Sequence, residues 1–158
     1  MTALSAVIMG HEQLYKTMVE GKSIASDAGA QTDVRKYAGA FNISAETKGD
    51  STPEQLEAAI LVEVKRLQDE LVSDRELQKV KNQNAAEQYR RLQSNFFLMI
   101  QLAVSESMGS WTEINEESAK IQAVTAADIQ RVARTYFKDE GRAVAIYKRK
   151  GSPGAAES

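Results

Sequence analysis

Hydrophobic residues recur at helical spacing behind strong helix-start signals in the second half of the chain. Residues 52–55 are Thr-Pro-Glu-Gln, which combines a hydroxyl N-cap, a proline at the first helical position and a glutamine three residues after the cap. The apolar positions that follow lie three or four residues apart, which predicts an amphipathic helix. These positions are Leu56, Ile60, Val64, Leu67 and Leu71.

Three further start signals predict the remaining helices. Ser73–Glu76 forms a second capping box and opens a long helix that we expect to run to Gly109. Helices are also predicted to start at Ser110 and at Thr125, where an acidic residue follows the hydroxyl residue by three positions. The last of these helices has an apolar stripe made of Ile129, Val132, Ala133 and Tyr136.

Two stretches have strand character and flank a charged connection. Residues 38–48 predict a strand because apolar and polar side chains alternate between Phe41 and Glu46. Residues 24–32 give a weaker strand signal, since they are rich in Ala, Ser and Gly. Residues 33–37 are charged and fit the connection between them. Together the three segments predict a β-hairpin.

The order of the predicted elements gives an α+β fold class. Ala143–Tyr147 is a continuous apolar run of strand length, which is typical of a strand buried at the centre of a sheet. With helices over Ala3–Met9 and Glu12–Glu20, we expect several helices layered on one face of an antiparallel or mixed sheet. Three strands make a thin sheet for so many helices, so we expect the domain to be truncated at its N-terminus. One domain is predicted over residues 1–150, with a disordered tail over 151–158.

The composition mainly excludes certain classes of functional site and partner. The 158 residues contain one histidine, His11, and no cysteine, which excludes cysteine nucleophiles, disulfides and Cys-rich metal clusters. A catalytic zinc site keeps three protein ligands, and His11 has no second histidine to join it. The formal net charge is −2, so nucleic acid is not an expected partner. No apolar run approaches the roughly 20 residues of a membrane span.

Three stretches, taken in order, resemble one protein family. They are LYKTMVEGKSIASDAG (residues 14–29), GAFNISAETKGDSTPEQLEAAILVEVKRLQDELVSDRELQKVKNQ (39–83) and IQAVTAADIQRVARTYF (121–137). No single stretch is specific, because capped amphipathic helices are common, but the ordered set is. It resembles the C-terminal half-domain of bacterial pitrilysin-type, or insulinase-type, zinc metallopeptidases. Mitochondrial processing peptidase and the core proteins of the respiratory bc1 complex share that fold.

The resemblance implies a zinc-dependent endopeptidase made of two similar half-domains that face each other across a chamber. In this family the N-terminal half binds zinc through a His-x-x-Glu-His motif, whereas residues 11–15 here are His-Glu-Gln-Leu-Tyr. The chain is therefore predicted to be the non-catalytic half, with no cofactor of its own. It would form the chamber wall and help to bind peptide substrate opposite a zinc-bearing partner. The resemblance also favours a periplasmic location.

The resemblance suggests two candidate substrate-binding residues. The C-terminal half of many family members supplies an Arg and a Tyr, seven positions apart, that contact the substrate near the metal. In this register the two positions fall on Tyr15 and Lys22, so neither identity matches. Lys22 would still offer a hydrogen-bond donor to a substrate carbonyl. Arg35 and Tyr37 of the hairpin connection are not assigned this role, and no catalytic or metal-binding residue is predicted.

Other interpretations stay open at this point. A catalytically inactive scaffold subunit of the same fold would act in assembly only, and the unmatched Tyr15 and Lys22 favour it. A helical interaction module unrelated to peptidases would contain no strands. The apolar pair Phe96 and Phe97 fits either an intradomain core or a face that docks another half-domain. Exposed sheet edges would also let the chain form a homo-oligomer.

Overall fold

The computed structural model describes residues 15–37 and 39–147, and its elements follow the predicted α+β order. A short π-helix, η1 (Lys16–Gly21), leads into an antiparallel hairpin of β1 (Ala25–Val34) and β2 (Gly39–Thr47). The predicted helix over Ala3–Met9 and the predicted tail lie outside the described residues. The later elements are α3 (Pro53–Asp69), α4 (Asp74–Leu92), α5 (Asn95–Met108), α6 (Glu113–Ala123), α7 (Ala126–Tyr136) and the 3₁₀ turn η2 (Asp139–Gly141).

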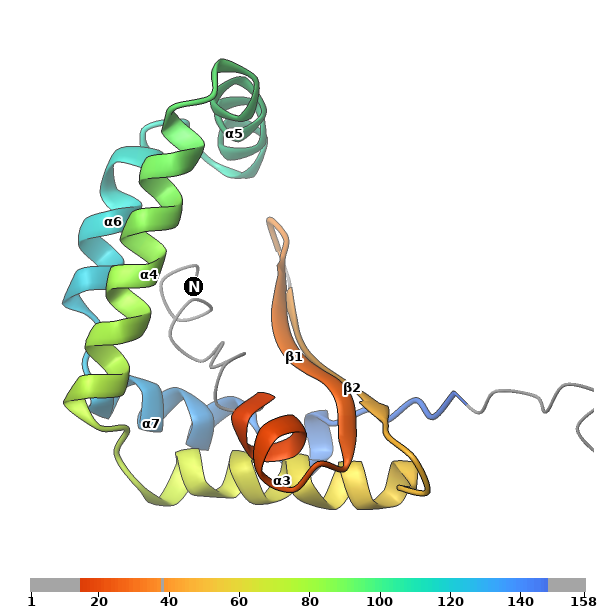
Figure 1. Cartoon of the computed structure of the whole chain (residues 1–158). Coiled ribbons are helices and arrows are strands. Elements are labelled where there is room, and N and C mark those ends of the chain that lie inside the picture. The colour runs from red at the N-terminus through yellow and green to blue at the C-terminus, as the bar shows by residue number, and fades with distance from the viewer. Residues whose placement is uncertain (1–14, 38, 148–158) are drawn as a thin grey trace, which may run out of the picture.

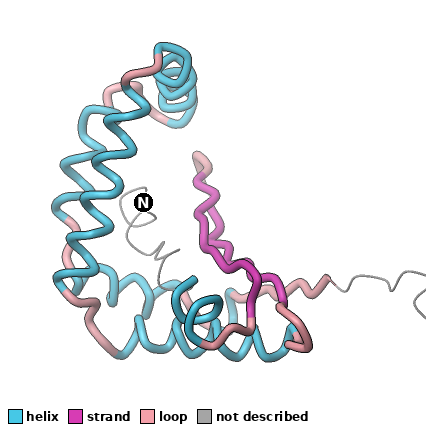
Figure 2. Tube along the Cα trace, viewed as in Figure 1, coloured by secondary structure: helices cyan, strands magenta, loops and turns pink. Residues whose placement is uncertain are grey.

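The elements form a base and an arm (Figure 1). The base consists of η1, the hairpin, α3 and α7; here α7 packs along α3, and the hairpin rises from α3. The arm consists of α4, α5 and α6; α4 and α6 run side by side away from the base, and α5 lies at their far end (Figure 2). The base therefore joins segments that are distant in sequence, whereas the arm is a run of consecutive helices.

Three of the predicted capping boxes form and fix the starts of α3, α4 and α7. At α3, the Gln55 backbone N–H donates to Thr52 Oγ1 at 3.3 Å, and the Thr52 N–H donates to Gln55 Oε1 at 2.9 Å. The same reciprocal pair of bonds joins Ser73 to Glu76 and Thr125 to Asp128. Each box satisfies backbone donors that a helix N-terminus otherwise leaves open. The predictions for these three starts are confirmed.

The long helix predicted from Ser73 to Gly109 is wrong, because the chain breaks after Leu92 into α4 and α5. The backbone tightens at the break: the N–H groups of Gln93 and Ser94 donate to carbonyls only three residues earlier. Ser94 is then extended, with φ −107° and ψ 114°. Serine and asparagine compete with helical hydrogen bonding, which favours a boundary at this point. None of the described helices has both the length and the apolar character of a membrane span.

The hairpin has the predicted alternation. Thr32 of β1 faces Phe41 of β2, and Ala30 faces Ile43, in an antiparallel register with one irregularity beside Ala25. Apolar residues of β2 are half-buried while their neighbours along the strand are exposed. One face of the hairpin therefore contacts the helices and the other meets solvent, as alternation requires.

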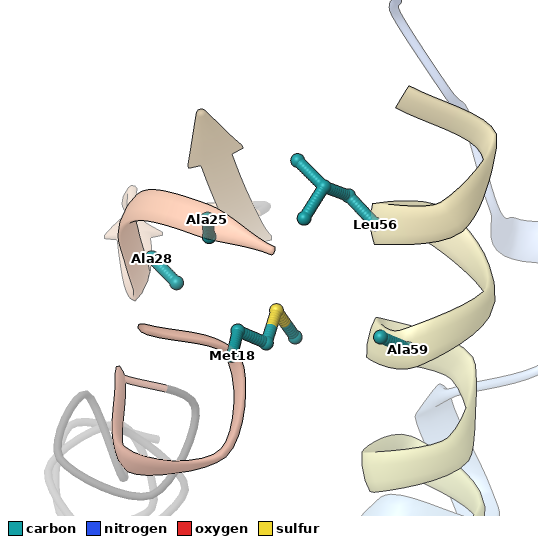
Figure 3. Close-up of a cluster of buried hydrophobic side chains, with 5 residues drawn as sticks. All are labelled: Met18, Ala25, Ala28, Leu56 and Ala59. Carbon is teal, nitrogen blue, oxygen red and sulfur yellow. The ribbon is translucent and has the colours of Figure 1, made fainter. Parts of the chain in front are cut away.

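Buried apolar residues form two clusters, and both lie in the base or where the arm joins it. The first combines Met18, Ala25, Ala28, Leu56 and Ala59 (Figure 3). The second combines Leu77, Val124, Ile129 and Val132, with the half-buried rings of Phe41 and Phe137 packed against it. These two rings come from β2 and from the residue after α7, and their centroids are 4.9 Å apart.

The third predicted strand is wrong. Ala143–Tyr147 forms no strand and is exposed, with Val144 at 52% and Tyr147 at 91%. A strand needs a neighbour that pairs with its backbone groups. Within residues 15–37 and 39–147 the sheet contains β1 and β2 only. The apolar composition of this segment was therefore not enough to predict its structure.

Candidate functional site

The two candidate substrate-binding residues lie at opposite ends of η1. Tyr15 directly precedes the helix and is 36% exposed, while Lys22 directly follows it and is also exposed. The helix predicted over Glu12–Glu20 is seen from Lys16 to Gly21, with π rather than α geometry. The Lys22 backbone N–H donates to the Thr17 carbonyl, five residues earlier, at 2.8 Å. The role of Tyr15 and Lys22 in substrate binding stays a prediction.

One side chain holds η1 on the base. Met18 is completely buried, and its thioether lies between the start of β1 and α3 (Figure 3). Small alanines on both of those elements leave room for this flexible side chain. Tyr15 and Lys22 thus flank a segment that is anchored by its centre. Met18 shares this cluster with Ala25, Ala28, Leu56 and Ala59.

The turn between η1 and β1 has an uncommon backbone conformation. Ser23 has φ 53°, in the left-handed region that few non-glycine residues adopt. The Ile24 N–H donates to the Met18 carbonyl at 3.0 Å, and Lys48 Nζ donates to Ser23 Oγ at 3.0 Å. Lys48 therefore brings a second ammonium group to the turn that carries Lys22. Such groups can hold carbonyl or carboxylate oxygens of a ligand.

The hairpin tip carries a separate set of polar and aromatic residues. Arg35 Nη2 lies 2.8 Å from Asp33 Oδ2, and this hydrogen-bonded carboxylate raises the pKa of Arg35. Lys36 Nζ lies 5.7 Å from the ring centroid of Tyr37. The tip lies at the end of β1 that is far from η1. At about 3.3 Å per residue along a strand, the length of β1 separates the two by on the order of 30 Å. The structure thus keeps Arg35 and Tyr37 apart from the two candidate residues.

The residues that the structure describes do not fit a zinc site. No three His, Asp or Glu residues among them lie close enough together to hold a metal ion, and His11 lies outside the described ranges. Glu116, one of the acidic residues in the first half of α6, forms an ion pair on the surface of its own helix. Lys120 Nζ lies 2.8 Å from Glu116 Oε2, and this hydrogen bond lowers the pKa of Glu116.

Comparison with known proteins decides the family. Residues 2–84 match the family model described as the Peptidase M16 inactive domain. The chain belongs to the M16 peptidase inactive-domain family. In this M16 domain the matched part includes η1, the hairpin, α3 and the first half of α4. The predicted resemblance to the non-catalytic half of a pitrilysin-type zinc peptidase is confirmed. No curated protein matches the sequence significantly.

Solved structures share the fold of the M16 domain. A protease from Helicobacter pylori has a TM-score of 0.79 at 22% identity, and the match covers 87% of this chain and 35% of that one. A "putative zinc protease" from Bordetella pertussis has a TM-score of 0.80 at 15% identity, covering 94% and 84% of the two chains. The inactive peptidase domain of a "putative zinc protease" from Bordetella parapertussis has a TM-score of 0.77 at 16% identity, covering 89% and 76%. The M16 domain thus spans about a third of the length of the Helicobacter protease.

The sequence did not predict two features of the turn at Ser23. The hydrogen bond from Lys48 to Ser23 joins residues that are 25 positions apart in the sequence. Ser23 itself has a left-handed backbone conformation without being the Gly or Asn that usually signals one. Of the two roles left open for Phe96 and Phe97, an intradomain core does not hold within the described part of the chain, because their exposed fractions are 61% and 56%. A docking face stays a prediction.

Proposed function

We propose that this M16 inactive domain forms one wall of the chamber of a two-half zinc endopeptidase and helps to bind the peptide opposite a zinc-bearing half. The observation that carries the proposal is the family match over residues 2–84. Hydrolysis would belong to the zinc-bearing half, and this domain would contribute binding. A periplasmic location remains a prediction that rests on the resemblance alone.

The hairpin supports a role in peptide binding. Within the described residues, β1 and β2 each have one neighbour, so each strand has an edge that does not pair with another strand. An extended peptide can add to such an edge through backbone hydrogen bonds, which give affinity with little sequence preference. The η1 segment lies at the start of β1, where Lys22 would offer a donor to the same peptide.

The inactive scaffold is the alternative within the same family. It is supported by the mismatch at Tyr15 and Lys22, which lack the Arg and Tyr identities seen in many family members. The unrelated helical module is set aside, because the chain contains a hairpin and belongs to the M16 family.

Reconstitution with a zinc-bearing M16 half from the same source tests the proposal. We expect this domain to lower the KM of that half for a quenched fluorogenic peptide, or to be required for its activity. In the mixture, Lys22→Ala should raise KM about 3- to 10-fold with little change in kcat, since a single hydrogen bond contributes about 1 kcal/mol.

Lys65→Ala is the matched control, because Lys65 is an exposed lysine of α3 that pairs only with Asp69 in the described contacts. It should leave KM unchanged. If the domain alters neither KM nor kcat of the zinc-bearing half, the proposed function is wrong. If activity requires the domain but Lys22→Ala behaves like Lys65→Ala, the scaffold alternative replaces the peptide-binding role.

A further inference from the structure

Among the described residues, α5 has an apolar surface that the rest of the fold leaves uncovered. This helix contains no buried residue, although most of its residues are apolar. Six large apolar side chains on it are 37–61% exposed. The two phenylalanines alone expose on the order of 200 Å², at about 150–250 Å² for a fully free aromatic side chain. Soluble monomers rarely show a contiguous apolar patch larger than a few hundred Å². The six are Phe96, Phe97, Met99, Ile100, Leu102 and Val104.

Four of the exposed residues form a regular seam along one face of α5. Phe96, Met99, Ile100 and Ala103 are spaced three and four residues apart and are all exposed, so they share one side of the helix. The half-buried residues, such as Leu98 and Ser105, fall on the opposite side, where α5 meets α4 and α6. A small residue, Ala103, near the middle of an apolar seam lets a second helix approach closely.

Charges lie at the two ends of the seam and have opposite signs. Arg90 and Arg91 lie in the last turn of α4, just before α5 begins, and both are exposed; Arg91 pairs with Glu87 of its own helix, so Arg90 carries the unpaired charge among the contacts of the described residues. Glu106 is the one charged residue of α5, lies near its C-terminal end, and accepts the Trp111 backbone N–H at 3.1 Å. If two copies of α5 packed antiparallel about a twofold axis, the acidic end of each would meet the basic end of the other. The same patch would then be complementary to itself, as a twofold interface requires.

We propose that the face of α5 that carries the seam is the interface of a twofold homodimer in which the α5 helices of two copies pack antiparallel. The apolar seam supplies the buried area, and Arg90 of one copy faces Glu106 of the other. Leu92 and Trp111, which are 50% and 51% exposed beside α5, extend the patch towards the roughly 800 Å² per partner of a standard interface.

Sedimentation velocity and cysteine cross-linking test this interface directly. The wild-type chain should sediment with twice the chain mass at about 10 µM, and Ile100→Glu should raise the dimer dissociation constant at least tenfold. Val62→Glu is the matched control, because Val62 is 58% exposed on α3, outside the seam. The chain has no cysteine, so Ala103→Cys should form a disulfide-linked dimer under mild oxidation while Val62→Cys should not.

Charge reversal tests the antiparallel arrangement. Glu106→Arg alone, or Arg90→Glu alone, should weaken the dimer, and the two changes together should restore it. Circular dichroism of every variant should show unchanged helix content. A wild-type chain that stays monomeric at 100 µM overturns the proposal. So does an Ile100→Glu variant that keeps the mass of the wild type but no longer binds the zinc-bearing half, which would assign α5 to that partner.

Discussion

The base and the arm of this M16 domain are built from similar helices but are stabilised differently. In the base, side chains from distant segments meet: Gln68 Nε2 of α3 donates to the Phe137 carbonyl at 2.7 Å, and Arg134 Nε of α7 donates back to the Gln68 carbonyl at 2.6 Å. In the arm, α5 contains no buried residue, and neither α5 nor α6 starts with a side-chain cap.

The difference indicates which surfaces the chain stabilises by itself. Apolar residues from distant segments of the base cover one another in buried clusters, so the base has the buried area that stabilises a fold. Apolar residues of α5 meet no such cover within the described residues and are free to contact another molecule. The same residue type should therefore have different energetic consequences in the two regions.

The largest effect is expected from shortening an isoleucine in each region. Ile129 of α7 is 1% exposed, so Ile129→Ala should lower the free energy of unfolding by about 2–5 kcal/mol. Ile100 of α5 is 41% exposed, so Ile100→Ala should lower it by less than about 1 kcal/mol. Urea unfolding at a concentration where the chain is monomeric measures both. Equal losses would mean that α5 is as well packed as α7, and the contrast between base and arm would be wrong.

Removing a helix cap should have an intermediate effect. Thr125 Oγ1 accepts the backbone N–H of Asp128 at 3.1 Å, so Thr125→Ala should cost about 1 kcal/mol in unfolding free energy. Thr112 occupies the same position before α6 but makes no side-chain cap bond, and Thr112→Ala should be close to neutral. Thermal unfolding of the two variants compares them. A loss at Thr112 that matches the loss at Thr125 would show that α6 is capped in solution.

The smallest expected effect is a loss of stability at low pH in the part of the molecule that contains α7. Hydrogen bonds from the Thr125 hydroxyl and backbone N–H, together with one from Arg131, lower the pKa of Asp128. The stabilisation is therefore complete above the ordinary aspartate pKa of about 4 and is lost as the pH falls through the lowered value. Asp128→Asn should flatten this part of the melting-temperature profile below about pH 4. A variant that keeps the wild-type slope there would assign the acid sensitivity to other carboxylates.

The features that were predicted correctly are those set by residues close together in the sequence. Thr52, Ser73 and Thr125 indicated the starts of their helices because a cap and its partner lie within one turn of each other. The hairpin followed from the alternation around Phe41. Neither required knowledge of what lies elsewhere in the molecule.

The features that depend on distant neighbours could not be predicted. Ala143–Tyr147 has a strand-like composition, but composition does not say whether a pairing strand is present. Phe96 and Phe97 would be core residues if another segment covered α5. The break at Ser94 was missed because the apolar spacing continues across it. For the candidate site, the sequence located Tyr15 and Lys22 on one segment, but not the contact of Lys48 with Ser23.

The stacking of Phe41 on Phe137 has a consequence for how the chain folds as it is synthesised. The two rings are separated by about one hundred residues, which a ribosome adds in roughly 5–20 s at 5–20 residues per second. During that interval the hairpin has emerged, but α7 and the ring that covers Phe41 have not. The strand edges of the hairpin are then exposed to other nascent chains. Slow translation of the segment between α3 and α7 should therefore lower the soluble yield of this domain.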